Sequence, residues 1–408
     1  MKPIRQQPSY TVLDLFCGAG GVSLGMTRAG FTVRQAIDFN RAAVATYREN
    51  FGDHVAALDL SASDLDLPTT DVITGGPPCQ GFSSAGLRRS GDPRNSLVSA
   101  FASHIVRLRP RAFIFENVEG FLTAENGERV LELLEPLVDA GYRIHLRKVN
   151  AANYGVPQHR KRVVGIGGLR WNPSFPAPTH TAFGAPGALN AGRHLPRTPT
   201  VEQSLEGLAQ PTRELPGDPQ GHFAHELEGD DLRRAIELRP GNTMRDLPAE
   251  LQHDSYRRRS LRRVMDGTPS EKRGGAPAGV RRLYADQPSK AITSGARGEF
   301  LHPVNHRYVT LRECARLQTF PDDFVFRGTQ AEQDVLVGNA VPPRFAESVA
   351  RSLSADLDTA APTFEKGALL SFVPTMAEGM SPALARTLAA VEATFPEVTP
   401  AEELKLWG

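Results

Sequence analysis

Cysteine is scarce in this sequence, with only three residues, Cys17, Cys79 and Cys314, among 408. No two of them form a CxxC pair, and none has the spacing to histidine of a zinc ligand set. The odd, sparse set argues against disulfides and against a metal centre, and it is typical of a reducing compartment. Cys79 is therefore expected to be free to act as a thiolate.

Long apolar runs are also missing. No stretch of 18 or more apolar residues occurs, and residues 1–10 lack the apolar core of a secretory signal. We therefore expect neither a membrane span nor export, and a cytoplasmic location. The composition, 40% hydrophobic and 23% charged, is that of a globular protein with room for two or three domains.

A strong net charge of either sign is absent, since the formal charge is only +1. Charge is nevertheless uneven along the chain, because residues 256–290 contain ten basic side chains against three acidic ones. Such a run fits either a solvated helix face or a surface that follows a phosphate backbone. The run alone does not decide between them.

Short apolar runs alternate with longer amphipathic stretches from residue 11 to about 167. This alternation predicts an α/β fold with a doubly wound, mostly parallel sheet, whose ligands lie beyond the carboxyl ends of the strands. The predicted strands are 11–16, 32–37, 55–58, 72–74, 112–115, 143–149 and 163–166. The helical patterns between them include 21–29, 41–50, 96–108 and 127–140.

The alternation stops at about residue 171, where proline, glycine, threonine and histidine become frequent. We expect one domain at 1–180, completed by 330–354, and a second, smaller and irregular domain at 181–329. Residues 355–408 form a C-terminal extension of unknown role, in which 381–395 has a helical pattern.

The stretch Pro77-Pro78-Cys79-Gln80 places a thiol in a loop directly after the apolar run 72–74. An isolated intracellular cysteine is most often a small buried hydrophobe. Here the framing glycines and prolines, and the neighbouring polar segments, favour a nucleophilic role for Cys79.

A glycine-rich turn, Gly18-Ala19-Gly20-Gly21, ends the first strand and opens a helix, where a ligand could approach the backbone closely. A nucleotide-like cofactor fits there, although the turn is not GxGxxG and is weak evidence by itself. Asp38 follows the second strand, where a carboxylate accepts hydrogen bonds from ribose hydroxyls, and Asp59 follows the third, near an adenine amino group. Surface or helix-capping acids are the alternative for both.

Glu116 follows the run 112–115 and is expected at the same edge of the sheet as Cys79, where partial burial would let it hold a proton. Arg160 and Arg162 stand two residues apart, so both could point to one side of an extended chain and bind a base oxygen or the glutamate. A helix-capping or surface acid and a solvated basic patch are the alternatives.

Taken in order, these segments resemble the motifs of the DNA (cytosine-5) methyltransferases of the bacterial restriction-modification type. The resemblance spans residue 11 to about 350 and leaves both ends and much of 171–280 without family pattern. The segments that carry it are 16–21, 75–83, 92–97, 116–118, 158–162, 312–321 and 338–343.

The resemblance implies a sheet of the S-adenosylmethionine-dependent methyltransferase type and transfer of a methyl group, without a metal, to C5 of a flipped-out cytosine in a short DNA sequence. Cys79 would add to C6 of the base as the nucleophile, while Glu116 would bind N3 and N4. Arg162 would hold the base O2, and Arg160 would orient Glu116.

For the cofactor, the resemblance implies that Phe16 stacks on adenine, Asp38 binds the ribose and Asp59 binds the exocyclic amine. The other residues expected around S-adenosylmethionine are Gly18, Gly20, Gly21, Pro78, Leu97, Asn339 and Val341. Residues 80–95 resemble a mobile catalytic loop, and 181–329 would form a target-recognition domain. The side chains expected to touch DNA are Gln80, Ser83, Arg94 and Thr293.

Two alternatives accompany this reading. One branch of the family modifies tRNA, but a basic recognition region of over 100 residues is longer than a compact RNA-modifying member is expected to carry. A non-catalytic DNA-binding regulator would have lost its nucleophile or its glutamate, and both are present. We therefore expect a monomer that acts on double-stranded DNA of the nucleoid, either beside a cognate restriction endonuclease or as a solitary modification enzyme.

Overall fold

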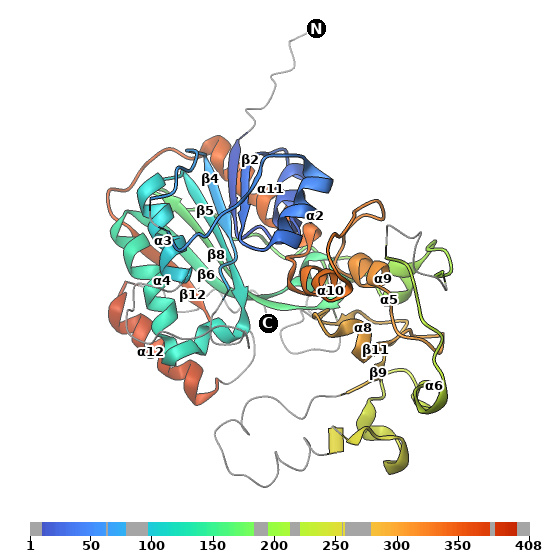
Figure 1. Cartoon of the computed structure of the whole chain (residues 1–408). Coiled ribbons are helices and arrows are strands. Elements are labelled where there is room, and N and C mark those ends of the chain that lie inside the picture. The colour runs from blue at the N-terminus through green and yellow to red at the C-terminus, as the bar shows by residue number, and fades with distance from the viewer. Residues whose placement is uncertain are drawn as a thin grey trace.

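The computed structural model describes residues 10–62, 64–78, 97–182, 195–212, 221–254, 256–257, 279–375 and 380–397. Within these ranges a large sheet domain and a smaller, irregular domain lie side by side (Figure 1). No helix in the described part of the chain is both long enough and apolar enough to span a membrane.

Eight strands form the central sheet in the order β12-β6-β8-β5-β4-β1-β2-β3. Neighbouring strands are parallel, except that β8 runs antiparallel to both β5 and β6. The predicted doubly wound, mostly parallel sheet is thus confirmed. The strands are β1 (Thr11–Leu15), β2 (Thr32–Asp38), β3 (Val55–Ala57), β4 (Val72–Gly75), β5 (Ala112–Val118), β6 (Tyr142–Asn150), β8 (Lys161–Leu169) and β12 (Ala368–Val373).

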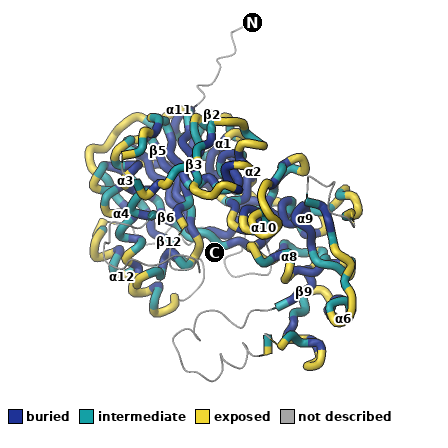
Figure 2. Tube along the Cα trace, viewed as in Figure 1, coloured by how far each residue is buried: buried dark blue, intermediate teal, exposed yellow. Residues whose placement is uncertain are grey.

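Helices cover both faces of this sheet, because successive residues of each strand alternate between the faces. Val12 of β1 packs in one apolar cluster, whereas Leu13 and Leu15 pack in another on the opposite face. The buried residues accordingly run through the sheet and along the inner sides of the helices (Figure 2). One face carries α1 (Gly21–Arg28), α2 (Arg41–Phe51) and α11 (Pro343–Thr359), and the other carries α3 (Leu97–Leu108), α4 (Glu128–Asp139) and α12 (Pro382–Thr394).

The segment after residue 354, for which the sequence predicts no role, contributes to the sheet domain. Strand β12 pairs in parallel with the outer side of β6. Helix α12 packs on the 3-10 helix η2 (Glu119–Gly127), where the hydroxyl of Thr387 donates to the Leu122 carbonyl oxygen at 2.8 Å. These contacts extend the sheet by one strand and cover η2.

The smaller domain is assembled from short elements around two apolar clusters. One cluster includes Ala42 and Ala43 of α2, so that it is continuous with the sheet domain. Apart from 3-10 helices, the described elements that lie beyond the sheet and its covering helices are β7 (Gln158–His159), α5 (Val201–Leu205), α6 (Gly229–Glu237), β9 (Arg281–Arg282), β10 (Ser289–Lys290), α8 (Ala296–Glu299), β11 (Phe300–Leu301), α9 (Leu311–Leu317) and α10 (Gln330–Asn339).

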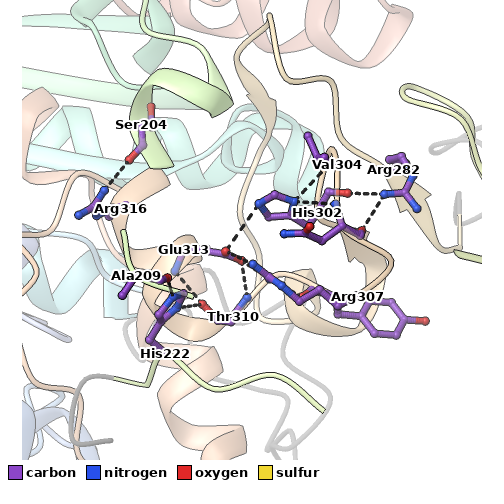
Figure 3. A network of polar contacts seen from close by, with 12 residues as sticks. Ser204, Ala209, His222, Arg282, His302, Val304, Arg307, Thr310, Glu313 and Arg316 are labelled. Carbon is purple, nitrogen blue, oxygen red and sulfur yellow. Dashed lines mark hydrogen bonds and ion pairs between the residues drawn. The ribbon is translucent and has the colours of Figure 1, made fainter. Parts of the chain in front are cut away.

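A buried carboxylate, that of Glu313, organises the start of α9 (Figure 3). It accepts two hydrogen bonds from the Arg307 guanidinium, at 2.9 and 2.6 Å, and one from the Thr310 amide at 2.9 Å. Although burial opposes it, these donors hold the pKa of Glu313 below its usual value. His222 joins the same network through the Thr310 hydroxyl at 2.9 Å and the Ala209 carbonyl oxygen at 2.6 Å.

Arg282 belongs to the basic run of 256–290, but it is only 3% exposed. Its guanidinium donates to the carbonyl oxygens of Leu238, His302 and Asn305, at 2.6, 2.6 and 2.8 Å, and also to that of Ala235. Arg282 therefore stabilises the interior of the smaller domain and does not belong to a phosphate-binding surface.

The packing of α12 can be tested at Gly127, which has a φ of +97° and whose Cβ would lie 2.7 Å from Oγ1 of Thr387. We expect Gly127→Ala to lower the free energy of unfolding by about 2 kcal/mol, since it combines backbone strain with a clash against α12. The matched control is Gly30→Ala, because Gly30 has a φ of +93° and nothing within 4 Å of its Cβ position. The strain of an L-residue in the left-handed region alone costs about 1 kcal/mol. Urea unfolding measures both variants, and equal effects would contradict the packing of α12 against Gly127.

Candidate active site

The turn between β1 and α1 forms one wall of a cavity. Phe16 and Gly18 have positive φ angles of 57° and 54°, and Gly20 caps α1 with a φ of 87°. Gly21 lets α1 approach the segment 338–343, because a Cβ there would lie 2.1 Å from the carbonyl oxygen of Val341. The glycine turn therefore brings together two segments that lie more than 300 residues apart in the sequence.

Asp38 ends β2 beside this turn. Its Oδ2 accepts a hydrogen bond from the Gly18 amide at 2.8 Å, and its Oδ1 accepts one from the Asn40 amide at 2.8 Å. Burial raises the pKa of Asp38. With the Phe39 amide as a third donor, the carboxylate still keeps one of its roughly four acceptor positions for a ligand. Asp59 follows β3 and accepts a hydrogen bond from the Ser61 amide at 3.0 Å.

A cavity of about 720 Å³ lies beyond the carboxyl ends of β1 to β4, a size typical of small-molecule sites. The residues predicted to bind a cofactor that line it are Phe16, Gly18, Gly21, Asp38, Asp59, Pro78, Leu97, Asn339 and Val341. Gly20 does not line it, because its missing side chain faces α2, where a Cβ would lie 2.4 Å from the Phe51 ring. Among the described residues, no group of three or more His, Cys, Asp or Glu side chains could hold a metal ion.

Among the apolar side chains of the cavity wall that sequence reasoning missed, two are exposed. Phe39 follows Asp38 and is 76% exposed, and Val335 of α10 is 42% exposed. Exposed apolar side chains beside a cavity are suited to contact a planar ring. Their signal in the sequence is slight, since a single apolar residue after a strand has the same appearance as a core position.

Asp14 was missed as well, and it is the most buried acid of the cavity wall, at 1% exposed. Ser23 donates its hydroxyl hydrogen to Oδ2 at 2.5 Å, and Thr74 donates to Oδ1 at 2.8 Å. The Tyr47 hydroxyl in turn donates to Ser23 at 2.9 Å. Burial raises the pKa of Asp14 to about 6, although these hydrogen bonds act in the opposite direction. Asp14 thus ties β1, β4 and α1 together beside the cavity.

Glu116 lies inside β5, which continues to Val118 and so extends beyond the predicted run 112–115. The antiparallel register of β5 and β8 sets Val118 opposite Arg162, and the Arg162 Nε lies 2.8 Å from Oε1 of Glu116. Gly76 leaves room for this carboxylate, since a Cβ there would lie 3.2 Å from Oε2. Oε1 is buried, and its contact with Arg162 is an ion pair without good hydrogen-bond geometry, so Oε1 can still accept a hydrogen bond from a ligand.

Arg160 does not make the contact predicted for it. Its side chain is fully buried and donates to the carbonyl oxygens of Ile292, Gly338 and Ala340, at 2.7, 2.9 and 2.9 Å. The ion pair with Glu116 is made by Arg162 instead. The reason is that β7 ends at His159 and β8 begins after Arg160, so the extended alternation breaks at this residue and its side chain turns inward.

The two cysteines in the described part of the chain are both buried. Burial raises the pKa of the Cys17 thiol and of the Cys314 thiol far above the physiological range. Neither is therefore suited to be a thiolate nucleophile. Cys79, Gln80, Ser83 and Arg94 lie outside the described residues, but Pro78, which precedes Cys79 in the sequence, lines the cavity. Thr293 is exposed on the segment between β10 and α8.

The mostly parallel, doubly wound sheet with a cavity at its carboxyl edge agrees with the fold of the S-adenosylmethionine-dependent methyltransferases, and a solved structure that superposes on the chain is a methyltransferase. Within this class, the chain belongs to the family of C-5 cytosine-specific DNA methylases, whose family model matches residues 10–355. The resemblance found in the sequence motifs is thus confirmed, and the chain is a DNA cytosine-5 methyltransferase.

Individual relatives agree with this assignment. The chain is 36% identical over 357 residues to the Type II methyltransferase M1.HphI of Haemophilus parahaemolyticus, covering 85% of this chain and 87% of that protein. It is 31% identical over 424 residues to the Type II methyltransferase M.AgeI of Thalassovita gelatinovora, covering 84% and 98%. Among solved structures, one described as a prophage-encoded DNA modification methyltransferase from E. coli superposes with a TM-score of 0.63 at 25% identity, covering 86% of this chain and 100% of that one.

The raised pKa of Asp14 makes the stability of the fold depend on pH. The carboxyl group titrates at about 6 in the folded chain, against an ordinary value of 3.8. The folded chain therefore binds this proton more tightly, and the resulting stabilisation is present below about pH 4 and lost as the pH rises through about 6. Between pH 5 and pH 7.5 the loss amounts to about 1 kcal/mol.

We expect Asp14→Asn, which cannot titrate, to lack this loss. The difference in free energy of unfolding between the wild type and Asp14→Asn should decrease by about 1 kcal/mol from pH 5 to pH 7.5. Urea unfolding at the two pH values measures it, with Asp230→Asn on the exposed side of α6 as the control. A difference that does not change with pH would show that Asp14 titrates at its ordinary value.

Proposed function

We propose that this enzyme transfers a methyl group from S-adenosylmethionine to C5 of a cytosine that it flips out of a specific short sequence in duplex DNA, through a transient covalent bond between Cys79 and C6. The observation that carries the proposal is that Glu116 and Pro78 line the same cavity as Asp38 and Asp59. A carboxylate suited to bind a base, and the residue next to a thiol, thus share one space with groups suited to bind a nucleoside.

The cavity residues fit S-adenosylmethionine, which supplies an electrophilic methyl group when it is bound. Asp38 keeps acceptor capacity for a ribose hydroxyl, and Asp59 offers an acceptor for the adenine amine. Phe16 and Phe39 provide aromatic rings on the cavity wall for the adenine plane. Gly18 and Gly21 allow close approach of the backbone.

Cys79 would begin the reaction as a thiolate that adds to C6 of cytosine. The addition makes C5 nucleophilic, so that C5 takes the methyl group. Loss of the C5 proton then expels the thiolate, which restores the C5–C6 double bond and frees the enzyme. Cys17 and Cys314 cannot take this part, because burial raises the pKa of both thiols.

Glu116 and Arg162 would bind the flipped base as a pair. Glu116 accepts a hydrogen bond from the N4 amino group and holds a proton at N3, which removes negative charge from the ring as the thiolate adds. The unused acceptor capacity of the buried Oε1 suits this part. Arg162 holds the base O2 with its guanidinium, while its Nε remains 2.8 Å from Glu116.

The DNA would lie along the carboxyl edge of the sheet. Extrusion of the cytosine costs a few kcal/mol, so contacts to the flanking backbone must hold the duplex open. Thr293 is exposed and is assigned to a phosphate beside the base, and Gln80, Ser83 and Arg94 to the DNA near the vacated position. Residues 181–329 are assigned to target recognition, and residues 1–180 with 330–354 to catalysis.

The relatives support a biological setting, since both relatives described above are named Type II methyltransferases. We place the enzyme in a restriction-modification system, with a cognate endonuclease that cuts the same sequence when it is unmethylated. It would act as a monomer on nucleoid DNA in the cytoplasm.

Bisulfite sequencing tests the proposal in a bacterial host that lacks cytosine methylation. Expression of the wild type should protect one cytosine of one short sequence from conversion throughout the genome, and Cys79→Ser should abolish the protection. Cys314→Ala is the matched control, because Cys314 is buried in α9 away from the cavity and its loss should leave protection intact. Soluble wild-type protein without any protected cytosine would overturn the proposal in favour of tRNA modification or of DNA binding without catalysis.

The part assigned to Glu116 has its own kinetic test. We expect Glu116→Gln to lower kcat at least about 100-fold, because an amide can bind the base edge but cannot hold a proton at N3. Transfer of a labelled methyl group to duplex DNA measures the rate. Glu119→Gln serves as the control, since this half-exposed carboxylate pairs with Lys148 and should leave kcat nearly unchanged. Similar losses in the two variants would mean that Glu116 acts only through general charge.

A further inference from the structure

The guanidinium of Arg160 joins two segments of the chain that belong to different parts of the proposed site. Its Nη1 donates to the carbonyl oxygen of Ile292, the residue before Thr293, at 2.7 Å. Its Nη2 donates at 2.9 Å to the carbonyl oxygens of Gly338 and Ala340, the two neighbours of the cavity residue Asn339. One planar group thus fixes the DNA-facing segment relative to the cofactor cavity.

Both backbone groups of Ile292 are held by side chains of this short stretch. While its carbonyl oxygen accepts from Arg160, its amide donates to Oε1 of Gln158 at 2.9 Å. Gln158 also donates to Gln318 at 2.8 Å, and Gln318 donates to the Val337 carbonyl oxygen at 2.5 Å. The position of Ile292, and with it that of the neighbouring Thr293, is thus linked to the end of α10, which lines the cavity.

The backbones of the two segments are also in direct contact. A Cβ at Gly338 would lie 2.2 Å from the Ser294 amide nitrogen and 2.4 Å from the Thr293 carbonyl carbon, so only glycine allows this approach. A second link is the ion pair between Arg297 of α8 and Asp334 of α10, at 2.5 Å. Asp334 precedes Val335 and Leu336, which both line the cavity.

The setting of Arg160 makes its geometry demanding. The side chain is fully buried, its three described hydrogen-bond partners are carbonyl oxygens, and its Nε has no partner among the described residues. Burial lowers the pKa of Arg160 accordingly. A buried cation that depends on carbonyl dipoles loses much free energy when one of them moves away, so the three contacts are made or broken together.

We propose that Arg160 is a positioning residue that couples the two ligands of the enzyme: it makes occupation of the cofactor cavity and placement of Thr293 for DNA favour each other. The inference rests on the proposed function, since it takes the cavity as the cofactor site and Thr293 as a DNA contact. A ligand that orders the 338–341 wall favours the state in which all three carbonyls are held, and the same state fixes Ile292 and Thr293. By linkage, DNA must then tighten cofactor binding by the factor by which the cofactor tightens DNA binding.

Calorimetric titration of the enzyme with S-adenosylhomocysteine tests the coupling. The titration is carried out without DNA and with a duplex that contains the target sequence found by bisulfite sequencing. For the wild type, the duplex should tighten S-adenosylhomocysteine binding about tenfold. In Arg160→Lys the enhancement should fall below about twofold, because a lysine keeps the charge but lacks the planar fork that spans both segments.

Arg312→Lys is the matched control. Arg312 is equally buried, and it donates to the carbonyl oxygens of Pro321 and Phe324, at 2.9 and 2.6 Å, which lie in neither segment. This variant should be less stable than the wild type and yet keep the tenfold enhancement. If Arg160 only supports the fold, Arg160→Lys will resemble Arg312→Lys in this ratio, and the proposal is overturned.

Hydrogen exchange of the wild type provides a measurement that needs no variant to fold. S-adenosylhomocysteine alone should slow amide exchange at 292–295, although these residues do not line the cavity. Unchanged exchange there would overturn the coupling. Failure of the wild type to bind S-adenosylhomocysteine at all would overturn the proposed function together with this inference, whereas binding that DNA does not enhance overturns the inference alone.

Discussion

The common direction of β1, β2, β4 and β5 is the constraint on which the site depends. Parallel strands present their carboxyl ends at one edge, so the glycine turn, Asp38, Gly76 and Glu116 meet there although about 100 residues separate the first from the last. The single reversed strand, β8, completes the arrangement because its beginning lies at this edge. Arg162, the second residue of β8, can therefore reach Glu116 of β5.

Local periodicity predicted seven of the eight sheet strands and helices α1 to α4 and α12 to within a few residues, because apolar alternation is a property of short stretches of sequence. Strand β12 and helix α11 were not predicted. The glycine turn and the acids after β2 and β3 were predictable for the same reason, since each follows its strand directly. What sequence could not supply was the direction of a side chain where the alternation breaks. Arg160 and Arg162 are two residues apart, so a continuous strand would place both side chains on the same face. Arg160 instead turns into the protein and Arg162 turns toward Glu116 at the cavity, because a separate strand begins between them.

The distribution of charge was the least informative part of the sequence. A basic side chain can donate its hydrogen bonds to backbone carbonyl oxygens as well as to phosphates, and composition does not distinguish these two roles. Arg282 and Arg160 both hold several carbonyl oxygens in the interior, and Arg307 holds a buried carboxylate. Where the chain has few long helices or strands, hydrogen bonds from buried arginine side chains therefore hold the backbone segments together.

The position of β12 bears on how the chain is made. Strand β6 is synthesised more than 200 residues before β12, the strand that covers its outer edge. During that interval the ribosome-bound chain exposes an unpaired strand edge, which is a template for pairing with another molecule. Arg143, His145 and Arg147 alternate along one side of β6, and such charged and polar side chains protect an open edge. The same side chains that contact Asn172 and Ser371 in the folded chain are thus suited to protect the edge of β6 until β12 emerges and pairs with it.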